Sequence, residues 1–351
     1  MIDYIVVGFG LAGLSVVEQL ERHTKSVHVF ENYSQKSSRV AGGLYNPVIL
    51  KRFTAAWDAR EQLQKAIPFY RNIERKLQEK FIYDLAILRR FNSVEEQNLW
   101  FEACDKPILR QFLSATLYQN HNTALDIPFA YGKVKYTGRI AIQEMLGCYL
   151  NYLDQKGCLS QEVFEYDRIE VQNDCIRYKG LQAKNIIFTE GFGIKRNPFF
   201  NYLPVVGNKG EYIIIKCEQL QLNEAVKSSI FIIPLGEHLY KVGATYNHQD
   251  KSSKTTTSAR IEIVKKLRTF LNVDFEIVAQ VAGIRPTVKD RRPLAGTHPH
   301  YRNLHVLNGL GSRGILIGPA TAENLYHHIE HGATLPKEIA IKRYETNSNK
   351  F

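Results

Sequence analysis

The chain has 351 residues, of which 44% are hydrophobic and 23% are charged, an ordinary globular composition with enough residues for a sizeable core and more than one domain. No apolar run reaches the roughly 18 residues that a transmembrane helix needs, which excludes a helical membrane protein. The net charge of +11 would suit an anionic partner, but the Lys and Arg residues are scattered, which favours a generally basic surface over a dedicated nucleic-acid stripe.

Five cysteines are present, and neither their odd number nor their spacing, which includes no CxxC pair, indicates a metal site or a set of disulfides. We therefore expect reduced structural thiols and no bound metal. The first residues lead directly into an apolar segment without the basic leader of a signal peptide, so a cytoplasmic protein without membrane contact is expected.

A glycine-rich turn follows the first apolar segment. Residues 4–7 predict a buried parallel strand, and apolar residues at helical spacing over residues 14–20 predict an amphipathic helix. Between them, Gly8 permits a tight turn, Gly10 lets the backbone approach a pyrophosphate, and Gly13 lets the helix pack close to the strand. Unpaired N–H groups at the helix N-terminus would then hold the phosphates.

The next strand supports a dinucleotide site. Residues 26–30 are apolar and end at Glu31, an acid about 20 residues beyond the glycines, where a carboxylate binds a ribose hydroxyl. An acid rather than an arginine there favours an unphosphorylated ribose, and so FAD or NAD rather than NADP. A strand, turn and helix without a ligand is the alternative, but the whole series in this order favours the dinucleotide.

Gly42 and Gly43 stand among small residues, which is typical of backbone that passes close to a flat ligand, although a plain turn fits equally well. Beyond them, residues 92–135 are irregular and indicate part of a second domain inserted into the first. The elements expected over this part are helices at residues 55–78, 94–104 and 142–155 and a strand at residues 82–88.

The chain is then expected to return to the first sheet and leave it for a second one. A short strand near Val163 and a hairpin of residues 169–171 and 175–178 lead to a buried strand at residues 185–191. Four strands without crossover helices follow, which implies an antiparallel sheet. They are expected at residues 203–207, 209–216, 230–234 and 239–246, with a helix at residues 259–271 after them.

Arg285 follows an apolar strand expected at residues 277–282. Because Pro286 fixes the local backbone, we expect the Arg285 side chain to project from a strand end. The residues alone favour an ion pair of Arg285 with Asp290 or Glu276.

A second strand, glycine turn and helix come near the end, at residues 304–307, 309–314 and 315–331. A helix N-terminus at residues 311–315 would stabilise the electron-rich end of a reduced flavin ring by its dipole. A glycine turn without a ligand is the alternative, but two such turns in one chain suit one long ligand.

Together these motifs resemble the D-amino acid oxidase and glycine oxidase (DAO) family of FAD-dependent oxidoreductases. The resemblance rests on the GxGxAG opening, Glu31, residues 39–43, the Thr-x-Gly strand end at Gly191 and the motifs GIRP and GxGSRGI, and it extends over nearly the whole chain. Within the family, residues 43–47, 290–296 and 309–314 are most similar to the FAD domain of a bifunctional bacterial enzyme that completes the modified wobble uridine of tRNA.

The resemblance implies an α/β plus α+β fold, with a Rossmann-like FAD-binding domain and a discontinuous antiparallel-sheet substrate domain. The FAD-binding domain would comprise residues 1–80, 136–200 and 281–351, and the substrate domain residues 81–135 and 201–280. FAD is expected without a covalent bond, because residues 307–311 offer no His or Cys at the attachment position.

The resemblance also implies site residues, with Arg285 as the catalytic residue that faces the substrate. Residues 189–191 read Thr-Glu-Gly where the family usually has Ala-Thr-Gly. The cofactor contacts that we expect are Gly8, Gly10, Leu11, Ala12, Gly13, Glu31, Arg39, Gly42, Gly43, Leu44, Thr189, Gly191, Gly311, Ser312, Arg313, Gly314 and Ile315.

The activity that these features favour is oxidation of the C–N bond of a small-molecule amine that bears a carboxylate, such as an amino acid or an N-substituted glycine. Hydride would pass to the flavin and then electrons to molecular oxygen, chemistry that needs orientation more than an acid–base pair. One alternative is oxidation of a carboxymethylaminomethyl group on tRNA wobble uridine, with tRNA as the partner. A non-catalytic flavin-binding module and an NAD-dependent dehydrogenase are further alternatives.

Overall fold

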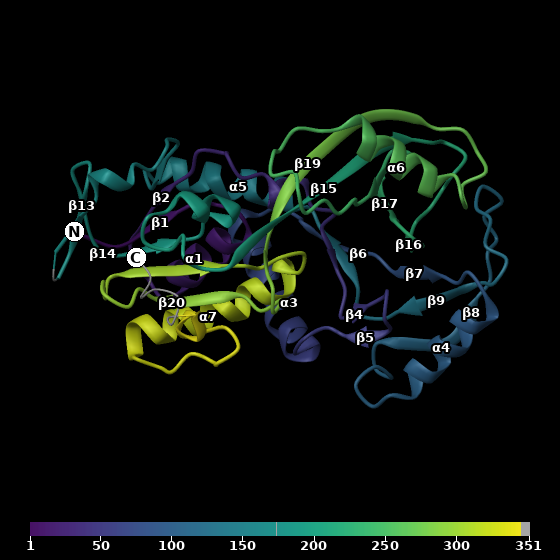
Figure 1. Cartoon of the computed structure of the whole chain (residues 1–351), viewed down its shortest axis with the longest axis horizontal. Helices are drawn as coiled ribbons and strands as arrows, with labels where there is room; N and C mark the ends of the chain where they lie inside the picture. The colour runs from purple at the N-terminus through teal and green to yellow at the C-terminus, as the bar shows by residue number, and fades with distance from the viewer. Residues whose placement is uncertain (173, 345–351) are drawn as a thin grey trace.

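The structure, a computed structural model, describes residues 1–172 and 174–344, and one half of it is built on an eight-stranded sheet (Figure 1). The sheet comprises β1 (Ile2–Val7), β2 (Val27–Phe30), β11 (Leu159–Ser160), β12 (Glu170–Val171), β13 (Ile176–Tyr178), β14 (Leu181–Phe188), β20 (Leu294–Thr297) and β21 (Leu304–Asn308). The strand order is β11-β2-β1-β14-β13-β12, with β21 paired to β14 and β20 to β21. Strands β2, β1, β14 and β21 pair parallel to one another, as crossover connections require.

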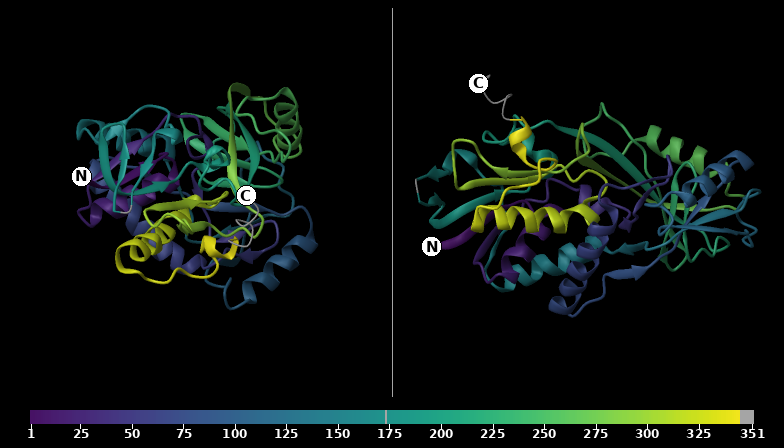
Figure 2. Two further views of the ribbon diagram at one scale, coloured as in Figure 1. Left: turned by 60° about the vertical axis from the view of Figure 1, so that its left-hand side comes forward. Right: turned by 90° about the horizontal axis from the view of Figure 1, so that it is seen from below.

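Both faces of this sheet are covered, so residues 4–7 of its central strand β1 form an unbroken buried apolar run. Tyr4 and Val6 of β1 pack into the core with the helices, whereas Ile5 and Val7 point into a second core on the opposite face. Figure 2 shows the C-terminal helix α7, in yellow, lying alongside the N-terminal helices. The helices of this half are α1 (Leu11–Arg22), α2 (Ser37–Val40), α3 (Ala59–Leu77), α5 (Ile142–Gln155) and α7 (Gly314–His331), with 3-10 turns η1 (Tyr166–Arg168) and η2 (Gly191–Arg196).

The other half is built on a second eight-stranded sheet, which is antiparallel except for one pair. It comprises β7 (Ile87–Arg90), β8 (Leu113–Tyr118), β9 (Tyr131–Val134), β15 (Val205–Lys216), β16 (Ala225–Lys227), β17 (Phe231–Gly236), β18 (Leu239–Gly243) and β19 (Glu276–Val288). Their order is β19-β15-β18-β17-β16-β7-β9-β8. Helices α4 (Val94–Asp105) and α6 (Thr257–Leu267) pack against this sheet through two further apolar cores.

Two small sheets complete the fold near the junction of the halves: β3 (Leu44–Tyr45), β10 (Gly138–Ile140) and β6 (Ile82–Asp84) form one, and β4 (Val48–Ile49) and β5 (Thr54–Ala55) form the other. The long strands β15 and β19 run from one half into the other (Figure 1). The expected combination of a Rossmann-like unit with an antiparallel sheet is therefore confirmed, while the proposed domain boundaries stay a prediction.

Several expected elements differ from the structure. Val163 lies outside any strand, and the short strand β11 precedes it. The expected strand at residues 82–88 is divided into β6 and β7. The two strands expected at residues 203–216 are one strand, because Gly207 and Gly210 leave room for close neighbours rather than ending the strand.

The strand expected at residues 277–282 also continues, to Val288, so Arg285 lies within β19 and does not project from its end. The reason is the long partner strand β15, which pairs with β19 as far as residue 288 and overrides the breaking tendency of Gly283 and Pro286. In the described residues, no helix combines the length and apolar composition of a membrane span.

Candidate functional site

A cavity of about 2160 Å³ is lined by residues of both halves and by both glycine turns. It brings together most of the residues expected from the sequence, although Gly13 and Arg39 do not line it. The expected residues that do line it are Gly8, Gly10, Leu11, Ala12, Glu31, Gly42, Gly43, Leu44, Thr189, Gly191, Arg285, Gly311, Ser312, Arg313, Gly314 and Ile315.

The first glycine turn joins β1 to α1 and is held by the returning strand β14. Gly8 has a φ of +91°, which glycine adopts without strain. A Cβ atom at Gly13 would overlap the carbonyl oxygen of Gly8, so α1 packs directly on the turn. The Thr189 hydroxyl donates to the Gly8 carbonyl at 2.6 Å. The N-terminus of α1 is thereby fixed at the cavity wall, where its first N–H groups have no intrahelical acceptor.

Glu31 stands at the end of β2 with its side chain 7% exposed. Its carboxylate accepts hydrogen bonds from the backbone N–H of Phe9 and, at 2.5 Å, from that of Tyr33. An ionised carboxylate has further lone pairs, so Glu31 can still accept from ligand hydroxyls. The carboxylate therefore both ties the loop after β2 to the glycine turn and offers acceptors to the cavity.

Arg39 lies behind the cavity wall. Its guanidinium stacks over the Tyr33 ring at 4.9 Å, and its buried Nη2 has no hydrogen-bond partner. Buried polar atoms are normally satisfied, so this nitrogen marks a place where an acceptor is missing. The direct cofactor contact expected for Arg39 stays a prediction.

The second glycine turn lies between β21 and α7. Gly311 has a φ of +57°, and its N–H donates to the Pro286 carbonyl at 2.9 Å, which joins the turn to β19. The Arg313 guanidinium donates to the carbonyl of Asn46 at 3.1 Å, and its burial lowers the pKa of Arg313. Arg313 therefore links the turn to the loop that begins at Gly43, whose Cβ atom, if present, would overlap a backbone carbonyl.

Asn308, which sequence reasoning missed, connects this turn to the first half of the site. Its amide donates to the Gly191 carbonyl at 2.9 Å and accepts from the N–H of Gly309 at 2.7 Å. The side chain is buried. An Asn between a buried strand and a glycine turn is a signal that could have been used, because Asn commonly bonds its own backbone at such positions.

Arg285 lies opposite Asn208 in the β15–β19 ladder and lines the cavity. Its guanidinium lies 4.8 Å from the centre of the Tyr246 ring, and Nη1 is 3.4 Å from the Thr245 carbonyl. A Cβ atom at Gly210 would overlap the guanidinium, so the glycine makes room for it.

No acid pairs with this arginine among the residues that the structure describes. Asp290 is instead bound by Arg343 at 3.0 Å, and Glu276 lies at the far end of β19. The ion pair that the residues alone favoured for Arg285 is therefore wrong. An arginine facing a cavity without a carboxylate can bind one from a ligand.

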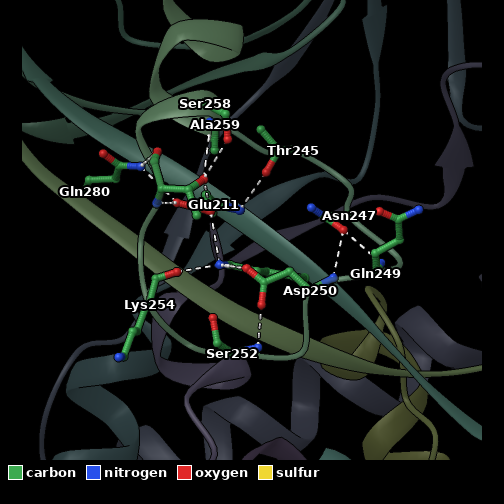
Figure 3. Close-up of polar contacts among 12 residues, drawn as sticks. Glu211, Thr245, Asn247, Gln249, Asp250, Ser252, Lys254, Ser258, Ala259 and Gln280 are labelled. Atoms are coloured by element: carbon green, nitrogen blue, oxygen red, sulfur yellow. Dashed lines mark hydrogen bonds and ion pairs between the residues drawn. The ribbon is translucent and has the colours of Figure 1, made fainter.

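On the face of β15 opposite the cavity, Lys209 and Glu211 form a polar cluster with Asp250 and Thr256, which we call the clamp. Figure 3 shows Glu211 and Asp250 of this cluster. The buried Lys209 ammonium bonds Asp250 at 2.5 Å and lies 3.4 Å from Glu211. The Glu211 carboxylate accepts from the N–H and the hydroxyl of Thr256 at 2.9 and 2.8 Å. The clamp therefore fixes the segment of residues 245–256, whose first residues pack against the Arg285 guanidinium.

Comparison with known proteins gives a family and a fold. A family model described as FAD dependent oxidoreductase (DAO) matches residues 3–327. Glycine oxidase of Bacillus subtilis is 23% identical over 345 residues, which covers 91% of this chain and 90% of that protein. The crystal structure of glycine oxidase from Geobacillus kaustophilus has a TM-score of 0.78 at 18% identity, with 98% of this chain and 97% of that chain covered.

A shorter match is to the tRNA 5-methylaminomethyl-2-thiouridine biosynthesis bifunctional protein MnmC of Shewanella halifaxensis. The identity is 24% over 179 residues, which covers 40% of this chain but only 28% of that protein.

The clamp yields a test of its own. Replacing Lys209 with Met leaves the buried Glu211 carboxylate without a cation, and breaking a buried pair from one side costs about 3–5 kcal/mol. We therefore expect Lys209→Met to lower the free energy of unfolding in urea by about 3 kcal/mol and to expose residues 247–256 to protease. Lys254→Met is the control, because only the backbone carbonyl of Lys254 bonds the clamp; equal stability of the two variants would contradict this role.

Proposed function

Since the chain belongs to the DAO family of FAD-dependent oxidoreductases, we propose that it oxidises the C–N bond of an amine that bears a carboxylate. The observation that carries the proposal is Arg285, a cation in the cavity wall with no acidic partner among the described residues and joined by Pro286 to the second glycine turn. The glycine oxidases among its relatives support an amino-acid or N-substituted glycine substrate.

The residues that line the cavity fit a non-covalently bound FAD. Both α1 and α7 begin at the cavity, and their first N–H groups, which have no intrahelical acceptor, suit the two anionic parts of the cofactor. The first of these in α1, that of Leu11, donates to the Ser38 hydroxyl at 3.0 Å. In the proposal the α1 N-terminus holds the pyrophosphate, Glu31 the ribose hydroxyls and residues 311–315 the pyrimidine end of the ring. The bound flavin would supply the hydride acceptor and pass the electrons on to oxygen.

The protein's part in the reaction is to bind and orient. The Arg285 guanidinium grips the substrate carboxylate with two parallel hydrogen bonds, and the Tyr246 ring limits its movement. Burial raises the pKa of Tyr212, against the opposing charge of Arg285, so this phenol stays protonated and acts as a donor rather than a base. The amine would react in its neutral form, because its nitrogen lone pair must be free. Transfer of hydride to the flavin would leave an iminium ion, which loses a proton and is hydrolysed.

A second candidate uses the same chemistry on a larger substrate. A carboxymethylaminomethyl group is itself an N-substituted glycine, so Arg285 would bind its carboxylate in the same way. The match to MnmC and the net charge of +11 support oxidation of such a group on tRNA.

Loss of the cofactor tests the first part of the proposal. A Cβ atom at Gly10 would lie 2.9 Å from the Ser38 hydroxyl, and a larger side chain would fill the space that the pyrophosphate needs. We expect the wild-type protein to purify yellow with FAD and Gly10→Val to purify colourless, as measured by absorbance and by flavin released on heating. Gly147→Val is the control, since a Cβ atom there meets nothing within 4 Å; flavin retained by Gly10→Val would refute the assignment.

Arg285→Ala tests the second part. The variant should stay folded and yellow, because Gly210 and Tyr246 do not need the guanidinium to pack. Flavin bleaching by carboxylated amines under anaerobic conditions should weaken by about 1.5–3 kcal/mol, the value of hydrogen bonds to a charged group. Arg285→Lys should fall between the two proteins because it keeps the charge and loses the paired geometry. Unchanged bleaching by a carboxylated amine, or an equal loss with an amine that lacks the carboxylate, would remove Arg285 from the site.

A further inference from the structure

The cavity continues past the residues proposed for cofactor and carboxylate into a strongly basic end. Its volume of about 2160 Å³ extends from the two glycine turns past Arg285 to this end. In the part of the chain that the structure describes, five cations and one carboxylate, that of Glu96, line this end. The cations are Lys51, Arg52, Arg89, Lys227 and Lys266.

These cations come from three separate parts of the fold, which meet only in the folded protein. Lys51 and Arg52 form the exposed turn between β4 and β5, and Lys266 lies in the last turn of α6. Arg89 and Lys227 are cross-strand partners in β7 and β16. Lys266 pairs with Glu262 at 2.5 Å, which leaves most of the positive charge without a counter-ion.

The floor of this basic end includes the buried side chain of Arg89 as well as exposed side chains. Arg89 is 7% exposed, rests on the Phe53 ring at 5.9 Å and holds Glu96 at 2.8 Å, but its buried Nε has no partner. The Lys227 ammonium donates to the Ser229 carbonyl at 2.9 Å and lies 5.0 Å from the centre of the Phe231 ring, and no acid among the described residues pairs with it. Burial, together with the charges of Arg89, Lys266 and Lys51, lowers the pKa of Lys227 to about 8. Cations held this closely repel one another, and an anion between them would relieve that repulsion.

We propose that this basic end is a subsite for a phosphate group of the substrate, at the end of the cavity away from the glycine turns. Within residues 1–172 and 174–344, three of these cations have no acid partner: Lys51, Arg52 and Lys227. One carboxylate would neutralise one of them, a phosphate dianion two, and successive phosphodiesters all three. The Ser228 and Ser229 hydroxyls, which line the same wall, supply neutral donors. The subsite deepens the proposed function and rests on it for the identity of the group oxidised, but its binding can be measured without turnover.

The test uses the FAD-bound protein with two probes, inorganic phosphate and a fluorescein-labelled RNA decamer. Lys51→Gln combined with Arg52→Gln removes two exposed charges from the β4–β5 turn, so folding is expected to survive. We expect about tenfold weaker binding of both probes, the effect of lost charge-assisted contacts. The logarithmic salt dependence of RNA binding should become shallower by about 1.4, since each lost phosphate contact contributes about 0.7.

The matched control combines Lys216→Gln with Lys342→Gln, two exposed lysines that do not line the cavity. Equal weakening by both pairs, or no binding of either probe to the wild-type protein, would overturn the subsite. RNA that binds at least tenfold more tightly than phosphate would identify a polynucleotide as the source of the phosphate. Equal affinity of the two probes would identify a small phosphorylated amine, and both results support the subsite.

The same preparation separates this proposal from the proposed oxidation. Phosphate binding that depends on Lys51 and Arg52, in a protein whose flavin no amine bleaches, would leave the subsite standing and defeat amine oxidation. Bleaching by carboxylated amines in a protein that binds neither probe would support amine oxidation and defeat the subsite.

Discussion

The antiparallel ladder between β15 and β19 is the constraint on which the site depends. It pairs residues 205–216 with residues 276–288 and runs through both halves of the molecule. Because side chains alternate across a strand, Asn208, Gly210 and Tyr212 line the cavity while Lys209 and Glu211 point to the other side. One face of β15 thus forms part of the cavity wall, and the other face holds the segment of residues 245–256 through the clamp.

This alternation explains why a one-residue slip would be costly here. It would turn Lys209 into the cavity and Gly210 out of it, so that the space used by the Arg285 guanidinium would be lost and a buried ammonium would lose its acids. Burying an unpaired charge costs several kcal/mol. The clamp therefore fixes the pairing register of β15 with β19 as well as stabilising the fold. This register places Arg285 next to the second glycine turn.

The sequence predicts the glycine turns well because their requirement is local. Gly8 and Gly311 adopt positive φ angles, and the strand before each and the helix after it are visible as periodic apolar residues. The helix α5 was predicted at its observed bounds for the same reason. A substrate role for Arg285 is predicted only through the family resemblance, since nothing near it in sequence distinguishes a ligand-binding arginine from an ion-paired one.

The rest of the site could not be predicted because it depends on contacts between distant segments. Gly207 and Gly210 suggest a break, and only the neighbouring β19 explains why the strand continues. Scattered basic residues suggested a general surface charge, whereas the fold gathers Lys51, Lys227 and Lys266 at one end of the cavity. Linear spacing carries no information about that convergence.

The distribution of charge in the cavity has a consequence for specificity. Among the described residues, Arg285 has no acidic partner and the basic end has fewer acids than bases, so an anion bound at either region would offset desolvation or repulsion there. A ligand with one anionic group satisfies one region and leaves the other uncompensated. A ligand with a carboxylate at one end and phosphate at the other satisfies both, and its two anchors fix the position of the amine between them. Selection by this pair of anchors follows from unsatisfied charge at two separate parts of one cavity.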